Sequence, residues 1–156
     1  MTPTAKTVAV WGTALAAVIV LRLVAVERGT ALRAVLLVAA TGEALAGVAY
    51  LARAPRMAVR AGRPYDPAYH GVMQDFGFYN LAIAYLLAAS ALDAAPNATV
   101  IRVAIGLYGA HGIAHLLRFA GLYFGGERPL ATRPRHLELR DGLQLLGPMV
   151  GMLLLR

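Results

Sequence analysis

The stretch that decides the fold is VIRVAIGLYGAHGIAHLLRFAGLYF, residues 100–124. A helix needs about 20 mostly apolar residues to span the hydrocarbon core of a bilayer, and this run exceeds that length. Its only formally charged residues, Arg102 and Arg118, lie toward its two ends, where long side chains reach the membrane surface. We therefore interpret it as a transmembrane helix that ends at Gly125 and Gly126.

The composition of the whole chain supports a membrane protein. The chain has 156 residues, of which 59% are hydrophobic, and its mean hydropathy is +0.61. Soluble domains contain about 45–50% apolar residues. A chain of this length holds one domain. It has no cysteine, which excludes disulfides, thiolate metal sites and cysteine nucleophiles.

Hydropathy predicts further helices on both sides of the opening stretch. Residues 8–26, 34–52 and 76–92 are each apolar and long enough to cross a bilayer. A signal peptide is the alternative for residues 8–26, but the apolar run is long and no cleavage site precedes a soluble domain, so we favour a retained helix. Residues 139–155 contain Gln144 and Pro148 and form either a short fifth span or a re-entrant or interfacial segment.

These segments define the predicted fold class. We expect one all-α domain over residues 1–156, an integral membrane bundle of four to five transmembrane helices. Gly106, Gly109 and Gly112 recur every three residues, and small residues in membrane helices favour close packing. The sequence shows no evident internal repeat.

The basic residues predict the orientation of the bundle. The formal net charge is +7, but the arginines lie in loops between apolar runs and not on one helix face. This pattern argues against a nucleic-acid partner and favours attraction to anionic headgroups of membrane lipids. Basic residues gather near the amino terminus and in both long loops. The positive-inside rule therefore places these segments in the cytoplasm, in a multi-pass protein of the cell membrane.

Ionisable groups at membrane depth are costly and mark candidate sites. Glu43 lies near the middle of residues 34–52 and is either a proton donor and acceptor or a structural hydrogen-bonding group. His111 and His115 lie four residues apart, on one helix face. That spacing suits a metal, but no glutamate follows His111, so the HExxH motif is not met. A haem held by two histidines needs ligands on opposite sides of the iron. We therefore expect no metal or cofactor, with haem or quinone as the minority alternative.

The start of the third span is rich in polar and aromatic groups. Asp75 is expected to cap the helix or to pair with an arginine, and Asn80 needs a partner inside the span. By predicted depth, Glu43 lies level with His111, Asn80 with His115, and Asp75 with Arg118. These three matched depths predict a polar pocket within the bundle that opens to the cytoplasm.

The stretch Gln74-Asp75-Phe76-Gly77-Phe78-Tyr79-Asn80 is similar to a Gln-Gly-x-Tyr-Asn element of an uncharacterised family of small membrane proteins. With the helix count, the chain resembles the DoxX-like class of small bacterial four-helix membrane proteins. That class includes quinone-linked oxidoreductase subunits, so the resemblance implies a redox or accessory role as one alternative. The intramembrane His and Glu also resemble the chemistry of sterol-isomerase-type bundles, by analogy alone.

The sequence favours a protein that binds a lipophilic small molecule in an intramembrane polar pocket. Acid–base groups without a redox cofactor suit isomerisation, cyclisation or epoxide opening. The predicted catalytic residues are Glu43, His111 and Asp75, and the predicted substrate-binding residues are Asn80, His115, Tyr79, Tyr108 and Gln74. The alternatives are a quinone- or haem-linked redox or accessory subunit, and a structural subunit of a membrane complex. A homo-oligomer is left open.

Overall fold

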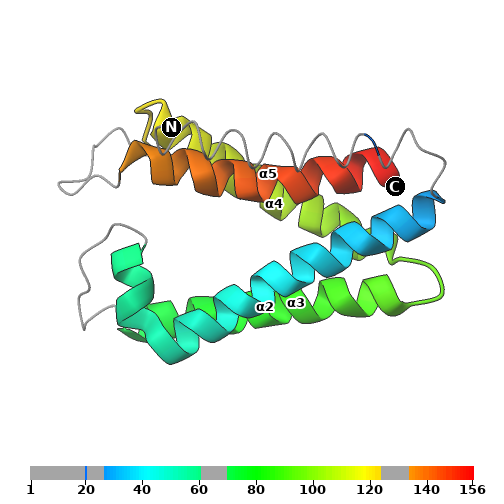
Figure 1. Ribbon diagram of the computed structural model, residues 1–156, viewed down its shortest axis with the longest axis horizontal. Coiled ribbons are helices and arrows are strands. Elements are labelled where there is room, and N and C mark those ends of the chain that lie inside the picture. Colours follow the sequence, from blue (N-terminus) through cyan, green and yellow to red (C-terminus); the bar gives the residue numbers. More distant parts are fainter. Residues whose placement is uncertain (1–19, 21–26, 61–69, 124–133) are drawn as a thin grey trace.

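The computed structural model describes residue 20 and residues 27–60, 70–123 and 134–156. These residues form four helices and no strand: α2 (Arg28–Arg60), α3 (His70–Leu92), α4 (Ala98–Phe119) and α5 (Arg135–Leu155) (Figure 1). The all-helical prediction is confirmed. The span predicted at residues 8–26 lies, apart from Val20, outside the described residues.

Three of the described helices are long and apolar enough to cross a membrane. They are the Arg28–Met57 part of α2, α3 and α4. With 21 residues, α5 is about 31 Å long at 1.5 Å per residue, which also matches a bilayer core. Its first two turns, however, carry Arg135, Glu138, Arg140 and Asp141. A fifth span formed by this helix therefore stays a prediction.

The helix ends differ from the predicted spans because hydropathy marks membrane depth and not helix termini. α2 continues past residue 52 through a kink at Arg53 (φ −144°, ψ 38°). Pro55 follows two residues later, and a proline ring inside a helix displaces the carbonyl four residues before it. α3 already begins at His70. α4 ends at Phe119, because Gly121 (φ +88°) takes the left-handed conformation that reverses the chain.

Side chains tie the helices together at the turn after α3. The Asn97 side chain caps α4 by accepting hydrogen bonds from the backbone N–H groups of Thr99 (2.9 Å) and Val100 (3.2 Å). From the start of α2, Arg33 donates to the carbonyl oxygens of Ala91 (2.7 Å) and Ala94 (2.6 Å), which lie at and just beyond the end of α3. We call this end of the bundle, with residues 93–97, the turn end, and the opposite end, with Arg53, the kink end.

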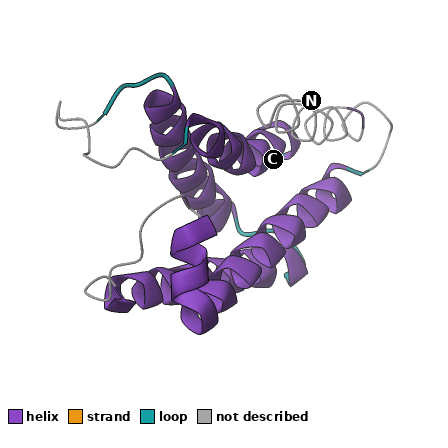
Figure 2. Cartoon of the chain, turned by 60° about the vertical axis from the view of Figure 1, so that its left-hand side comes forward, coloured by secondary structure: helices purple, strands orange, loops and turns teal. Residues whose placement is uncertain are grey.

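The helices pair as two antiparallel hairpins, α2 with α3 and α4 with α5 (Figures 1 and 2). Contacts between the hairpins run mainly from α2 to α5, and the two layers lie closer together at the turn end than at the kink end (Figure 1). The buried core is drawn from all four helices. Its members are Ala31, Leu32, Leu36, Ala39, Ala40, Leu87, Ala91, Ile101, Ala104, Tyr108, Met152 and Leu155.

Each hairpin crosses at a pair of glycines. In the first hairpin, a Cβ on Gly47 would lie 2.9 Å from the carbonyl oxygen of Gly77, and a Cβ on Gly77 would lie 3.0 Å from that of Gly47. Leu81 covers Gly47 and Leu51 covers Gly77. In each case the leucine Cγ would lie 2.8 Å from a Cβ added to the glycine. The two backbones are therefore too close to admit any larger residue without a shift.

The second hairpin repeats this crossing. Cβ atoms on Gly112 and Gly142 would each lie 3.2 Å from the other residue's carbonyl oxygen, with Leu146 over Gly112 and Leu116 over Gly142. Gly109 also packs on α5, with an added Cβ 3.1 Å from the Met149 sulfur, whereas no described residue lies within 4 Å of a Cβ on Gly106. Close packing is thus confirmed for Gly109 and Gly112, and Gly106 has no such contact with the described residues.

The two hairpins correspond residue by residue with a shift of 65 positions. Both crossing glycines, and the leucines over them, recur at this distance. One glycine and one leucine lie in GVAYLAR (47–53) and GIAHLLR (112–118), and the others lie in GFYNL (77–81) and GLQLL (142–146). Buried positions recur in the same way: Leu36 with Ile101, Ala39 with Ala104, Leu87 with Met152, and Ser90 with Leu155. The expectation of no internal repeat is therefore wrong. The bundle contains two copies of one structural unit, in which few residues outside the crossings are identical.

Candidate functional site

Four polar residues follow one face of α4. Tyr108, His111, His115 and Arg118 are spaced by three, four and three positions, which aligns them along the helix. We call them the polar stripe. It extends about 15 Å along the axis, roughly half of a bilayer core, and runs from the middle of α4 toward the kink end.

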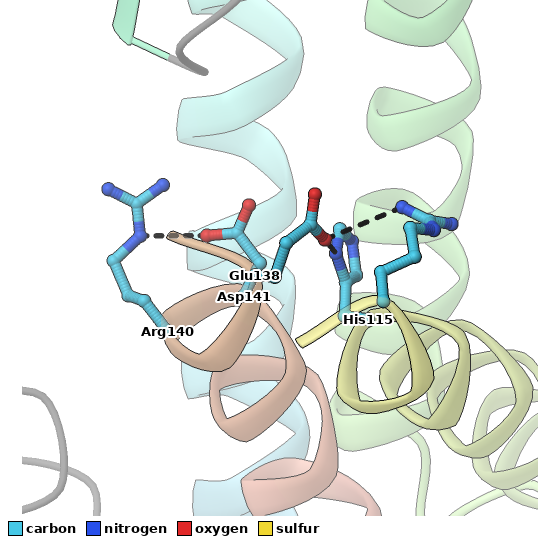
Figure 3. A network of polar contacts seen from close by, with 5 residues as sticks. His115, Glu138, Arg140 and Asp141 are labelled. Atoms are coloured by element: carbon cyan, nitrogen blue, oxygen red, sulfur yellow. Dashed lines mark hydrogen bonds and ion pairs between the residues drawn. The ribbon is translucent and has the colours of Figure 1, made fainter. Parts of the chain in front are cut away.

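The centre of the stripe is a buried ion pair with α5. His115 Nδ1 lies 2.6 Å from Glu138 Oε2, and the two residues are only 6% and 4% exposed (Figure 3). The glycine crossing sets this contact. His115 lies one turn after Gly112 and Glu138 one turn before Gly142, so the antiparallel helices bring the two side chains together.

The charges around Glu138 define the roles of the imidazole nitrogens. Arg118 Nη1 lies 3.6 Å from the same Glu138 oxygen, which places a positive charge beside the carboxylate. Because a carboxylate oxygen accepts hydrogen bonds, we assign the hydrogen of this contact to His115 Nδ1. In the neutral ring, Nε2 is then the basic atom. A carboxylate that fixes a histidine in this way orients it for proton transfer.

His111 is the accessible member of the cluster. Its ring stacks on that of His115, with centroids 4.8 Å apart and planes inclined by 28°, while the residue itself is exposed. It also lies within electrostatic range of Arg118, Glu138 and Asp141. Asp141 in turn accepts from Arg140 Nε at 2.7 Å (Figure 3). The two arginines and two carboxylates balance, so the cluster is neutral overall when both histidines are neutral.

Glu43 extends the stripe to the other hairpin. Its half-buried carboxyl lies close to the hydroxyl of the buried Tyr108. The predicted depth put Glu43 level with His111, and the structure instead pairs it with Tyr108, one turn nearer the turn end.

The remaining predicted site residues lie on α3, in the first hairpin. Gln74 and Asn80 are half-buried, Asp75 is exposed, and Tyr79 is 67% exposed. Within the described part of the chain, the polar contacts of His115 and Arg118 are with α5 and not with these residues. The expected pairs of Asn80 with His115 and of Asp75 with Arg118 are therefore not formed.

Sequence reasoning missed Glu138, because the start of α5 is strongly polar and resembles a loop that leads into a short apolar segment. A signal was nevertheless present: Gly142 and Leu146 repeat the spacing of Gly77 and Leu81. Aligning these pairs places Glu138 one turn before a crossing and therefore opposite His115.

The geometry also bears on metal and haem. Two stacked rings on one helix cannot be axial ligands on opposite faces of one iron. Among the described residues, no group of three or more His, Asp or Glu side chains is arranged to hold a metal ion.

A surface hollow of about 440 Å³ lies at the turn end, away from the stripe, between Leu32, Ile101 and Arg102.

Comparison of the chain with protein-family models, curated proteins and solved structures gives no match. The DoxX-like resemblance accordingly stays a prediction, and the site is argued from its own geometry.

Proposed function

We propose that this protein binds a lipophilic small molecule beside the polar stripe and exchanges protons with it, as an acid–base enzyme. The observation that carries the proposal is the buried contact of His115 with Glu138 at 2.6 Å, next to the exposed ring of His111. Both histidines belong to a helix that is long and apolar enough to cross a membrane.

Packing alone does not account for these groups. The contact between α4 and α5 is already formed by Gly112, Gly142 and the leucines that cover them. Ionisable residues in membrane helices are expensive and mark functional sites. Replacing a buried ion pair with apolar residues is often neutral or stabilising. The presence of this buried pair therefore favours a chemical role over a structural one.

The arrangement supplies both halves of a proton transfer. The Nε2 atom of His115 accepts a proton from the substrate, Glu138 stabilises the resulting imidazolium, and the same ring returns the proton at a second atom. An isomerisation of this kind removes one proton and adds one, so it needs no oxidant or reductant. Cyclisation and epoxide opening use the same groups. Glu43 and Tyr108 provide a second donor and acceptor one turn away.

Exchange of solvent deuterium tests this proposal, with a mixture of natural lipids as the source of substrate. Purified protein in lipid nanodiscs is incubated in heavy water with a lipid extract, and deuterium in the recovered small molecules is measured by mass spectrometry. We expect at least one lipophilic species to gain deuterium with the unaltered protein and with the Tyr85→Phe control, but not with His115→Gln. Equal incorporation with His115→Gln would falsify the proposal.

A further inference from the structure

The two hairpins differ most where the polar stripe lies. At the positions that correspond to His111 and His115, the first hairpin has Ala46 and Tyr50. The positions of Glu138 and Asp141 correspond to Met73 and Phe76 in the same way, while Arg118 corresponds to Arg53. One hairpin therefore carries ionisable groups where its copy carries apolar and aromatic ones.

The first hairpin has an aromatic contact near the level of the ion pair. The rings of Tyr50 and Phe76 lie 6.5 Å apart between centroids, inclined by 41°, in the favourable range for aromatic pairs. They join α2 to α3. By the shift of 65 positions, Tyr50 corresponds to His115, and Phe76 corresponds to Asp141, one turn from Glu138. Tyr50 is half-buried and Phe76 is 56% exposed, so part of this apolar surface is available for contact.

The hairpins present these surfaces to each other. Glu43 and Tyr108 are corresponding positions and lie close to each other. Tyr108 also shares a buried core with Leu36 and Ala40 of α2. Residues that meet their own counterparts lie at the axis of a two-fold relation. Toward the kink end, the next positions on this face are Ala46 and Tyr50 on α2, and His111 and His115 on α4. Helical periodicity therefore places both sets on the sides of α2 and α4 that turn toward the other hairpin.

We infer that the molecule bound at this site is amphipathic and lies between the hairpins. Its small polar group contacts His111 and His115, and its apolar body lies against Ala46, Tyr50, Met73 and Phe76. The inference rests on the proposed function for the location of the site, but not for the chemistry carried out there. A ligand with a hydroxyl, carbonyl or epoxide at one end and a hydrocarbon or ring system at the other can contact the histidines with its polar end and the first hairpin with its apolar end.

Photolabelling with two probes tests this orientation. The probes are long-chain alcohols that carry a diazirine either beside the hydroxyl or in the middle of the chain, and labelled residues in the full protein in nanodiscs are mapped by mass spectrometry. We expect the first probe to label α4 near His111 and the second to label Tyr50, Met73 or Phe76. Labelling of one hairpin by both probes, or labelling no stronger than at the exposed Tyr85, overturns the inference.

Variants separate this inference from the proposed function. Tyr50→Leu should reduce mid-chain labelling of the first hairpin several-fold, whereas the matched control Tyr85→Leu should leave it unchanged. His115→Gln should abolish deuterium exchange yet keep the mid-chain labels on the first hairpin. If the unaltered protein shows oriented labelling but no deuterium exchange, the acid–base function fails and the binding site stands. If deuterium exchange occurs without oriented labelling, the acid–base function stands and the inferred placement of the ligand between the hairpins fails.

Discussion

His115 and Glu138 are brought together by a helix crossing in which neither takes part. The crossing is made by Gly112 and Gly142, whose backbones approach so closely that a Cβ on either would lie 3.2 Å from the other's carbonyl oxygen. The ion pair therefore depends on two residues that have no side chain and no chemistry of their own.

The first prediction concerns this crossing. Gly112→Ala should lower the free energy of unfolding by about 1–3 kcal/mol, because overpacking a tight contact has that cost. It should also weaken the contact of His115 with Glu138. Gly106→Ala, on the same helix with nothing within 4 Å, is the matched control and should be neutral or stabilising. Denaturant titration in detergent measures both, and equal stability of the two variants would contradict the geometry.

The second prediction extends the comparison to the other hairpin. Gly47→Ala should destabilise the protein at least as much as Gly112→Ala, because its Cβ would lie 2.9 Å from a backbone oxygen that cannot move independently. Gly42 has open space around its ideal Cβ position and serves as the control. Unfolding in the same denaturant and detergent compares the variants. If Gly47→Ala folds as stably as Gly42→Ala, the two crossings are not equivalent.

The third prediction separates the two halves of the ion pair. Glu138→Leu alone should cost about 3–5 kcal/mol, because it leaves buried polar and charged partners uncompensated. The double variant with His115→Leu should recover much of that loss, since apolar replacement of a whole pair is often neutral. A double-mutant cycle from unfolding measurements gives the coupling. Additive effects would show that the two side chains do not interact.

The fourth prediction concerns the turn end. Asn97→Ala should reduce stability by about 0.5–2 kcal/mol, because the backbone N–H groups of Thr99 and Val100 lose their acceptor. Asn97→Asp keeps an acceptor oxygen at the start of the helix and should retain most of the stability. Thermal unfolding of both variants provides the measurement, with the prediction failing if alanine and aspartate behave alike.

Hydropathy predicted the helices well because the bilayer core imposes a length that the sequence must match. α3 and α4 both lie over predicted spans, and His111 and His115 were correctly assigned to one face of α4. Depth was a weaker guide to partners. Two residues at the same depth need not be neighbours, because the rotation of each helix about its axis decides which way its side chains point. Glu43 accordingly lies beside Tyr108 and not beside His111.

The partner of His115 could not be found from periodicity, because Glu138 lies 23 positions away, before the start of the predicted fifth segment. The rotation of α5 is set by Gly142 against Gly112, a long-range contact without a hydropathy signal. Comparing the two halves of the sequence around their glycines would have supplied it. The boundaries at His70 and Phe119 were missed because a helix extends or stops by backbone geometry and not by polarity.

The 65-position correspondence of the hairpins has a consequence for how such a site can evolve. In a homodimer of identical hairpins, every substitution appears on both sides of the symmetry axis, so an ion pair on one face brings a second ion pair opposite it. Fusing the two units in one chain removes that constraint. One half can then carry His115 and Glu138 while the other carries Tyr50 and Met73 at the corresponding positions, so the two sides of one bundle differ in chemistry.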